Sequence, residues 1–410
     1  MTLPSSIDVA IIGAGAAGIG AARALEERGL NVLILEARDR LGGRAFTRPL
    51  EGGIVFDVGC GWLHSADRNK FTKIAESLGL DIDRGRPHWS DQAFNIGFPQ
   101  AERAQYLAEM EAFYARCEQA AEQDDDRPAS DFLAPENRWN AMLNCVSTYI
   151  NGAELDRVSI HDMDAYEDTE FNWRVKRGYG TLVAAYGAPC AVALNTQATL
   201  IDHSGPRLRI ETNRGTLTAA KAIVTIPTNL IANETLRFFP ALPEKVNAAA
   251  GLPLGLADKV MLALDDDGEA LPRDGHLRGS TTKVGTGSYH LRPQGFPSIE
   301  GYFGGHFARE LENAGDGAMA ALAIDEIVAL LGSGYRKKLR PLAWSRWAHD
   351  PFATGSYSHA LPGHADDRAT LAAPVNGRIF FAGEATSPNF FSTCHGALES
   401  GERAAGEVKG

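Results

Sequence analysis

The sequence predicts an α/β protein with a parallel sheet at its centre. The chain opens with an apolar run, a glycine-rich turn, a helical pattern and a second apolar run, which is the order of a βαβ unit. Strand-like and helical patterns continue to alternate toward the C-terminus. The length of 410 residues allows two domain-sized cores, or one large domain with a second inserted into it.

The predicted elements follow from apolar periodicity and from the turn residues between them. In chain order they are strands at 7–12 and 31–35 around a turn at 13–18 and a helix at 19–28, helices at 71–79 and 102–123, a hairpin over 208–226, a strand at 259–264, a helix at 318–331, a strand at 378–382 and a final helix that starts near Thr393.

Composition excludes several classes of function. The net charge of −12 would repel a phosphate backbone, so nucleic acid is not expected as a partner. The five cysteines form no CxxC pair and no metal-ligand spacing, which fits a reducing compartment and predicts no metal site. No apolar stretch is long enough to span a bilayer and no signal peptide is recognisable, so we expect a cytoplasmic protein that is not held at a membrane.

The glycine-rich turn is a dinucleotide-binding motif in its proper context. Gly13, Gly15 and Gly18 satisfy GxGxxG directly after a strand and at the start of a helix, with Ala16 and Ala17 between them. Gly13 would make the turn, Gly15 would let the pyrophosphate approach the backbone, and Gly18 would permit close helix packing. Glu36, at the end of the second strand, would accept hydrogen bonds from the adenosine ribose, which argues against NADP.

The residues that follow separate FAD from NAD. The run 36–44, E-A-R-D-R-L-G-G-R, resembles the E-A-R-x-R-x-G-G-R extension of the flavin amine oxidase family. In that family the arginines and the Gly-Gly turn wrap the diphosphate and the flavin side, so the resemblance adds Ala37, Arg38, Gly43 and Arg44 to the cofactor site. It implies a Rossmann-type FAD-binding domain interleaved with an α+β substrate-binding domain.

A second part of the resemblance lies at the opposite end of the chain. Residues 379–387 and 392–401 are similar to the family's closing F-A-G-E-x-T-S and T-x-H-G-A signatures. The resemblance places Gly383, Glu384 and Thr393 at the flavin, with the N-terminus of the last helix aimed at it, where the dipole would stabilise the anionic reduced form. An N-cap that serves only its own helix is an equal alternative for the Thr393 side chain.

Three further segments resemble parts of the family that face the flavin and the substrate. Residues 254–260 are similar to the segment whose lysine, here Lys259, holds a water against flavin N5; the alternative is a surface lysine. Residues 346–358 resemble the polyamine oxidases and their histone-demethylase relatives, which implies that Trp347 packs on the flavin and that Tyr357 is one wall of an aromatic cage. Residues 57–64 resemble the segment whose histidine borders the substrate in animal polyamine and spermine oxidases.

His64 could therefore exchange a proton with a substrate nitrogen, or it could be structural. Gly61, Trp62 and Ala198 complete the cofactor-binding residues that the resemblance implies.

Two departures refine the reading. Ser356 stands where the monoamine oxidases have a cysteine bonded to the flavin, so FAD would be bound non-covalently. Thr393 stands at their second cage tyrosine, which is the polyamine oxidase pattern.

The expected domains are an FAD-binding domain of residues 1–78, 178–254 and 355–410 and a substrate-binding domain of residues 79–177 and 255–354. The expected function is oxidation of a polyamine- or monoamine-type substrate to an imine or aldehyde by hydride transfer to flavin N5, with reoxidation by molecular oxygen and release of hydrogen peroxide. Two alternatives remain: a flavin dehydrogenase or desaturase of the same superfamily that acts on a non-amine substrate, or a flavin-binding protein without turnover. We expect a monomer or a homodimer.

Overall fold

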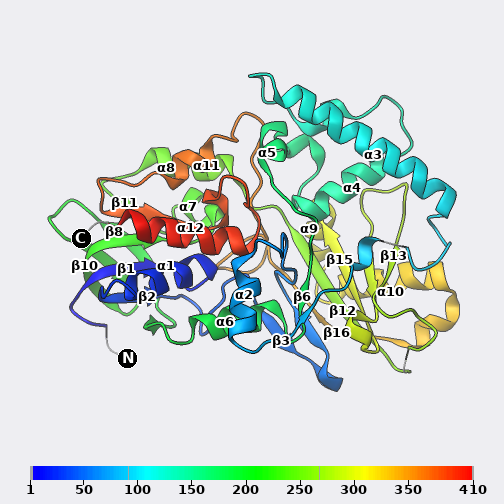
Figure 1. Ribbon diagram of the computed structural model, residues 1–410, viewed down its shortest axis with the longest axis horizontal. Coiled ribbons are helices and arrows are strands. Elements are labelled where there is room, and N and C mark those ends of the chain that lie inside the picture. The colour runs from blue at the N-terminus through cyan, green and yellow to red at the C-terminus, as the bar shows by residue number, and fades with distance from the viewer. Residues whose placement is uncertain (1–2, 91, 267, 409–410) are drawn as a thin grey trace.

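A mixed sheet of eight strands forms one half of the molecule (Figure 1). The structure, a computed structural model, describes residues 3–90, 92–266 and 268–408. The strand order is β11-β8-β9-β10-β1-β2-β7, with β17 beside β10. The bounds are β1 (Ser6–Ile12), β2 (Val32–Leu35), β7 (Val192–Ala193), β8 (Ala198–Asp202), β9 (Leu208–Thr212), β10 (Gly215–Val224), β11 (Arg237–Phe239) and β17 (Ile379–Phe381).

The centre of this sheet is parallel, as the sequence predicts. β1 pairs in parallel with β2 and β10, and β10 pairs in parallel with β17, which comes from the far end of the chain. The predicted hairpin over 208–226 is confirmed, because β9 and β10 are antiparallel neighbours. The parallel strands are apolar on both faces, as expected for strands covered by helices on two sides.

The first and last helices of the chain lie side by side on this sheet, α1 in blue and α12 in red (Figure 1). α1 (Ala16–Glu26) begins three residues before the predicted helix, because the loop ends at Gly15 and alanine favours the helix. Glycines let the two helices touch: a Cβ at Gly401 of α12 (Cys394–Glu407) would lie 2.0 Å from the Ala17 carbonyl oxygen.

An antiparallel sheet of five strands organises the other half, in the order β13-β14-β15-β12-β16. One of its faces packs on α9 (Gly305–Asn313) and α10 (Ala318–Leu331). The bounds of α10 match the helix predicted at 318–331. The apolar residues Val260, Leu277 and Tyr289 point to this side of the sheet. Alternate residues therefore face the opposite side. The strands are β12 (Ala257–Leu264), β13 (Gly275–Arg278), β14 (Ser288–Leu291), β15 (Ser298–Gly304) and β16 (Leu339–Trp344).

A helical layer with a hydrophobic cluster of its own lies beside the second sheet (Figure 1). It contains α3 (Gln100–Ala121), α4 (Asn140–Ile150) and α5 (Ile160–Ala165), packed around Phe113, Trp139 and Leu155. The long helix predicted at 102–123 is α3, shifted by two residues. The remaining elements are β3 (Thr47–Pro49), β4 (Val55–Asp57), β5 (Ile82–Asp83), β6 (Arg174–Val175), α2 (Lys70–Ser77), α6 (Tyr179–Gly187), α7 (Thr228–Ala232), α8 (Pro243–Gly251), α11 (Asp367–Ala372) and short 3-10 segments.

The strands of the two sheets fall into different parts of the chain. Every strand of the eight-stranded sheet lies within 1–78, 178–254 or 355–410, and every strand of the five-stranded sheet lies within 255–354. The exact domain boundaries stay a prediction. Within 3–90, 92–266 and 268–408, no helix has the length and apolar character that crossing a membrane requires.

Candidate active site

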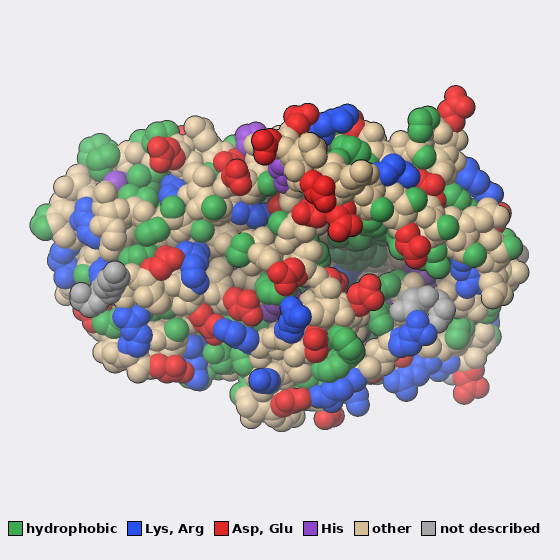
Figure 2. All heavy atoms as spheres, turned by 45° about the horizontal axis from the view of Figure 1, so that its top comes forward, with side chains coloured by type: hydrophobic (Ala, Val, Ile, Leu, Met, Phe, Trp, Pro, Cys, Tyr) green, Lys and Arg blue, Asp and Glu red, His purple; other side chains and the backbone are tan. Residues whose placement is uncertain are grey.

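A cavity of about 1540 Å³ runs between the two sheets and the helical layer. Figure 2 shows the surface hollowed at this place, with acidic side chains around the rim and hydrophobic side chains within. Of the residues that the sequence singles out, all but Gly18 line it: Gly13, Gly15, Ala16, Ala17, Glu36, Ala37, Arg38, Gly43, Arg44, Gly61, Trp62, His64, Ala198, Lys259, Trp347, Tyr357, Gly383, Glu384 and Thr393.

Two glycines of the loop differ in the space around them: Gly15 leaves room for a ligand, and Gly18 is packed against the protein. A Cβ at Gly18 would lie 1.9 Å from the Gly13 carbonyl oxygen, so the helix packs directly on the turn. Gly13 itself has φ of 107°, a conformation that favours glycine. A Cβ at Gly15 would meet no heavy atom of the described residues within 4 Å. Gly15 therefore faces open cavity at the N-terminus of α1, where backbone N–H groups favour an anion.

Glu36 is held at the end of β2 by the backbone. Its Oε2 accepts from the Ala14 N–H at 2.6 Å and its Oε1 from the Arg38 N–H at 2.8 Å, while the residue is 6% exposed. Each carboxylate oxygen keeps acceptor capacity toward the cavity. A ribose hydroxyl is the kind of donor that could use it.

All three arginines of the 36–44 run are engaged within the protein, and Arg40 donates from Nη1 to the Gly43 carbonyl at 2.9 Å. Arg38 donates from Nη1 and Nη2 to the Asp350 carboxylate at 2.7 and 2.6 Å, although it lines the cavity. Arg44 donates from Nη1 to the Ser356 carbonyl at 2.6 Å and to Glu384 Oε1 at 2.9 Å. Arg38 thus joins two distant segments of the chain through a bidentate ion pair with Asp350. The local motif did not reveal this partner.

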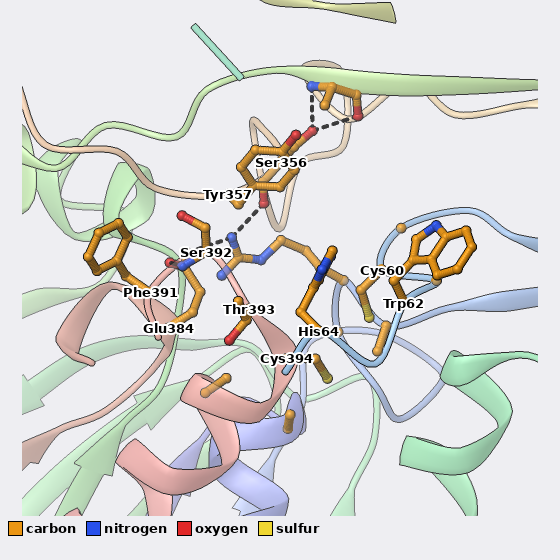
Figure 3. A pocket seen from close by; sticks show the side chains of 18 of the residues that line it. Cys60, Trp62, His64, Ser356, Tyr357, Glu384, Phe391, Ser392, Thr393 and Cys394 are labelled. Atoms are coloured by element: carbon orange, nitrogen blue, oxygen red, sulfur yellow. Dashed lines mark hydrogen bonds and ion pairs between the residues drawn. The ribbon is translucent and has the colours of Figure 1, made fainter. Parts of the chain in front are cut away.

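Glu384 connects the two ends of the chain. Besides Arg44, it accepts from Ser358 Oγ at 2.6 Å and from the Ser392 N–H at 2.9 Å. Burial would raise the pKa of Glu384, but the Arg44 charge and these hydrogen bonds outweigh burial and lower it. Figure 3 shows Glu384, Thr393 and His64, which come from separate segments, arranged around one space.

Thr393 caps the last helix. Its Oγ1 accepts from the Gly396 N–H at 3.0 Å and donates to the Phe390 carbonyl at 2.6 Å. The structure thus gives the side chain the N-cap role, and the helix N-terminus with its partial positive charge lies at the cavity.

Lys259 is a buried lysine, not a surface one, with 6% of its area exposed. Its Nζ donates to the Asp57 carbonyl at 3.0 Å and lies 3.4 Å from Glu300 Oε1. Burial would raise the pKa of Glu300, but the charges of Lys259 and Arg174 bring it to about 2. The charged pair is therefore retained inside the cavity wall.

His64 is positioned by an amide. Its Nδ1 lies 2.6 Å from Asn172 Oδ1, and the Asn172 Nδ2 donates to the Glu170 carbonyl at 3.1 Å, which fixes the amide orientation. Nδ1 must therefore carry the proton, and Nε2 is left as an acceptor. Burial lowers the pKa of His64, with Asp168 opposing it, so the ring is neutral at pH 7.

Aromatic side chains line the part of the cavity beyond Lys259. The Tyr357 hydroxyl donates to the Tyr149 carbonyl and lies 3.0 Å from the Tyr302 hydroxyl. Trp347 donates from Nε1 to the Val58 carbonyl at 3.1 Å. Ser356 Oγ bonds to the Ala257 backbone at both N–H and carbonyl, so its hydroxyl is engaged by β12.

The structure adds residues that the sequence did not single out. Most come from 80–170, a region without a recognisable motif, and from the cavity face of the five-stranded sheet. Five exposed hydrophobic side chains also line the cavity, Trp89, Leu107, Tyr114, Ile150 and Phe171. Deeper in, Arg278, Ser288, His290 and Tyr302 line the sheet floor. The alternation of β13, β14 and β15 could have identified these faces, but not which strands are neighbours.

Among the described residues no cluster could hold a metal ion, and all five cysteines are free thiols.

Comparison with known proteins gives consistent results. A family model described as "Flavin containing amine oxidoreductase" matches residues 16–144 and 99–409. Polyamine oxidase 4 of Oryza sativa subsp. japonica is 28% identical over 439 residues, across 98% of this chain and 88% of that protein. Lysine-specific histone demethylase 2 of Homo sapiens is 25% identical over 441 residues, across 98% of this chain and 53% of that protein.

Solved structures show the same fold. A putrescine oxidase with redesigned cofactor binding superposes with a TM-score of 0.80 at 19% identity, covering 100% of this chain and 99% of that one. The cyclohexylamine oxidase from Brevibacterium oxydans gives a TM-score of 0.78 at 20% identity, covering 99% of each chain.

The cavity fits the cofactor of such a family. Gly15 opens a cradle that a Cβ would enter, Glu36 offers acceptors, and the N-termini of α1 and α12 both reach the same cavity. These features suit FAD, with its diphosphate and its isoalloxazine. The matches over nearly the whole chain, together with this cradle, establish that the protein belongs to the flavin containing amine oxidoreductases and uses FAD as its cofactor.

Proposed function

We propose that the protein oxidises a small amine with molecular oxygen, giving an imine and hydrogen peroxide. The observation that carries this proposal is that one cavity joins the dinucleotide cradle to a pocket walled by Lys259, His64 and Tyr357. When bound, FAD supplies the acceptor for the hydride that leaves the carbon beside the amine nitrogen. The balanced reaction converts amine and oxygen to imine and peroxide, and water then hydrolyses the imine.

The residues of the chain prepare the amine for this step. An amine gives up hydride readily only when its nitrogen is neutral, so its ammonium proton must leave first. His64 Nε2 is an acceptor at neutral pH and lines the cavity, so we assign it as the group that takes this proton. Aromatic walls formed by Tyr357 and Tyr302 exclude water and tolerate residual positive charge.

Lys259 completes the proposed machinery. Its buried ammonium is held between the Asp57 carbonyl and the Glu300 carboxylate, so its position is defined. We infer that it binds a water in the cavity and places a positive charge where oxygen is reduced. Trp347, Thr393 and the residues of the cradle would bind FAD, and the engaged Ser356 hydroxyl supports non-covalent binding.

The relatives support an amine substrate, since those compared are named as oxidases of polyamines, putrescine and cyclohexylamine and as a lysine-specific histone demethylase. A peptide-demethylase role is less favoured, because the net charge is −12 and the described ranges contain no long inserted coiled coil. A cytoplasmic location, the monomeric or homodimeric state and the domain boundaries given above remain parts of the same proposal.

The test is a substrate screen on the purified holoprotein. Anaerobic mixing with monoamines, diamines and polyamines should bleach the yellow flavin with at least one of them, and air should then restore the colour with one peroxide per amine. Bleaching without peroxide would favour a dehydrogenase, and a flavin that no amine reduces would favour a binding protein. Denaturation should release all the flavin from the chain.

A further inference from the structure

Arg278 is a buried cation for which the described part of the chain offers no counter-ion. It ends β13, lines the substrate half of the cavity and is 9% exposed. Neither Nε nor Nη1 has a hydrogen-bond partner, and no described residue forms an ion pair with this guanidinium. A buried charge without a counter-ion is costly, so its retention calls for an explanation.

The nearest structural explanation does not hold. Glu326 of α10 is bonded to Gly287 and Tyr289 beside the same strands, but on the side of the sheet that packs on α10. Its carboxylate accepts from Thr286 Oγ1 at 2.7 Å, from the Gly287 N–H at 2.9 Å and from the Tyr289 hydroxyl at 2.6 Å. Arg278 faces the cavity instead, and Glu326 does not neutralise it through an ion pair.

A second unpartnered group lies in the same part of the cavity. The buried hydroxyl of Tyr106, on α3, has no hydrogen-bond partner among the residues that the structure describes, and it also lines the cavity. It is close enough for the charge of Arg278 to act on its pKa, which burial raises to about 12. A guanidinium fork and a phenol that both lack an acceptor form a site for an acceptor-rich anion.

The sheet register connects this site to Lys259. Lys259 pairs with Tyr302, Tyr302 pairs with Ser288, and Ser288 pairs with Arg278, so the four form one row across adjacent strands. All four line the cavity. Three strand spacings of about 4.8 Å place the backbones of Lys259 and Arg278 about 14 Å apart. The anion site therefore lies at the far end of the cavity floor from Lys259.

We propose that Arg278, with Tyr106, binds an anionic group at the distal end of the substrate, so that the preferred amine carries a carboxylate several carbons away from its nitrogen. This inference rests on the proposed amine oxidation and names its substrate class. It separates the protein from an enzyme for polycations, because a polyamine would bring a second ammonium toward an unneutralised guanidinium.

The acidic rim does not oppose this assignment. Asp168 and Glu170 line the mouth, but they are exposed to solvent, where water and salt screen their charges. Glu300, the buried carboxylate of the cavity wall, is already paired with Lys259 and Arg174. A zwitterionic amine can therefore pass the rim and place its anionic group against the Arg278 guanidinium.

The experiment compares three amines of equal length on the holoenzyme: ω-aminooctanoate, octylamine and α,ω-diaminooctane, with ω-aminooctyl phosphate as a second anion. We expect kcat/KM to be at least tenfold higher for an anionic member than for octylamine, and lowest for the diamine. The carboxylate and phosphate arms identify which anion fits the site. Equal values for octylamine and both anions would overturn the proposal.

Variants locate the effect. Arg278→Met should abolish the preference for the anion while it leaves octylamine oxidation within a factor of two or three, and Arg278→Lys should keep part of it. Arg336→Met, which removes a cation that is 56% exposed outside the cavity, is the matched control and should change nothing. Arg278→Met should also fold at least as stably as the wild type, because it removes an unpaired buried charge.

A binding measurement separates this proposal from the proposed function. Octanoate cannot be oxidised as an amine, so its binding is read from the change in the flavin absorption spectrum. If no amine reduces the flavin but octanoate binds to the wild type and at least tenfold more weakly to Arg278→Met, the oxidase proposal fails and the anion site stands. If amines are oxidised but octanoate binds both proteins equally, the anion site fails alone.

Discussion

The Lys259 ammonium lies 3.4 Å from the Glu300 carboxylate, on neighbouring strands β12 and β15 of the cavity floor. Both side chains are buried, so the pair is not screened as a surface ion pair would be. Glu300 also contacts Arg174 at 3.4 Å, and both cations act on the buried Asp57 carboxyl as well. A cluster of buried charges thus lies close to the place where we assign oxygen reduction.

Replacing Lys259 by Met should slow oxygen consumption by at least about tenfold, the equivalent of 1.4 kcal/mol, because the buried positive charge is lost. The pKa of Glu300 should rise in the same variant, since Lys259 is the largest cause that lowers it. The measurement is oxygen uptake with a saturating amine. Lys245→Met is the control, because Lys245 is equally buried but bonds to carbonyls of the α11 region outside the cavity. Unchanged oxygen use in Lys259→Met would remove this residue from the mechanism.

Alanine substitutions at two glycines of the same loop should affect different properties, stability at Gly18 and FAD binding at Gly15. Gly18→Ala should destabilise the protein by about 3 kcal/mol, because the new Cβ would lie 1.9 Å from the Gly13 carbonyl oxygen. Gly15→Ala should fold nearly normally, because its Cβ meets no protein atom, but it should bind FAD more weakly. Thermal unfolding of the apoprotein and FAD titration measure the two effects. Gly334→Ala, also without a neighbour within 4 Å, should affect neither. Full FAD affinity in Gly15→Ala would contradict the cradle.

The cap of the last helix should contribute to stability. Thr393→Ala removes the acceptor for the Gly396 N–H and should lower the free energy of unfolding by about 1 kcal/mol. Thr393→Ser retains an oxygen at the same place and should restore most of this loss. Urea unfolding of the two variants gives the comparison, and an alanine variant as stable as the serine variant would show that the cap is unimportant.

Stability should fall on acidification through buried histidines. Burial lowers the pKa of His359 to about 4, and within the described ranges neither of its ring nitrogens has a hydrogen-bond partner. Below about pH 6.5 the unfolded chain binds a proton at this site that the folded protein refuses until about pH 4, so the free energy of unfolding decreases as the pH falls through that window.

At pH 5 this one residue should cost about 2 kcal/mol relative to pH 8. The check is a series of urea unfolding curves between these pH values for wild type and His359→Gln, in which the variant should show the weaker pH dependence. His306→Gln, at an exposed histidine, is the control and should follow the wild type. A variant that follows the wild-type curve would refute the assignment.

Much of the fold could be predicted because its signals are local. An apolar strand, a turn of glycines and a helix occupy adjacent residues, so β1, α1 and β2 follow from the periodicity of one short segment. The same is true of β12, α10, β17 and the start of α12. The cofactor cradle follows too, since the tasks of Gly13, Gly15 and Glu36 depend on their spacing along the chain.

The sequence by itself thus determined the fold class, the cofactor and most of the residues around it. The tertiary structure decided that Arg38 pairs with Asp350, that Lys259 is buried beside Glu300, and that Arg278 lies across the sheet from Lys259 with no counter-ion among the described residues. The reason is physical: strand order and register bring together residues far apart in the chain, and the free energy of a charge depends on these neighbours and not on its place in the sequence.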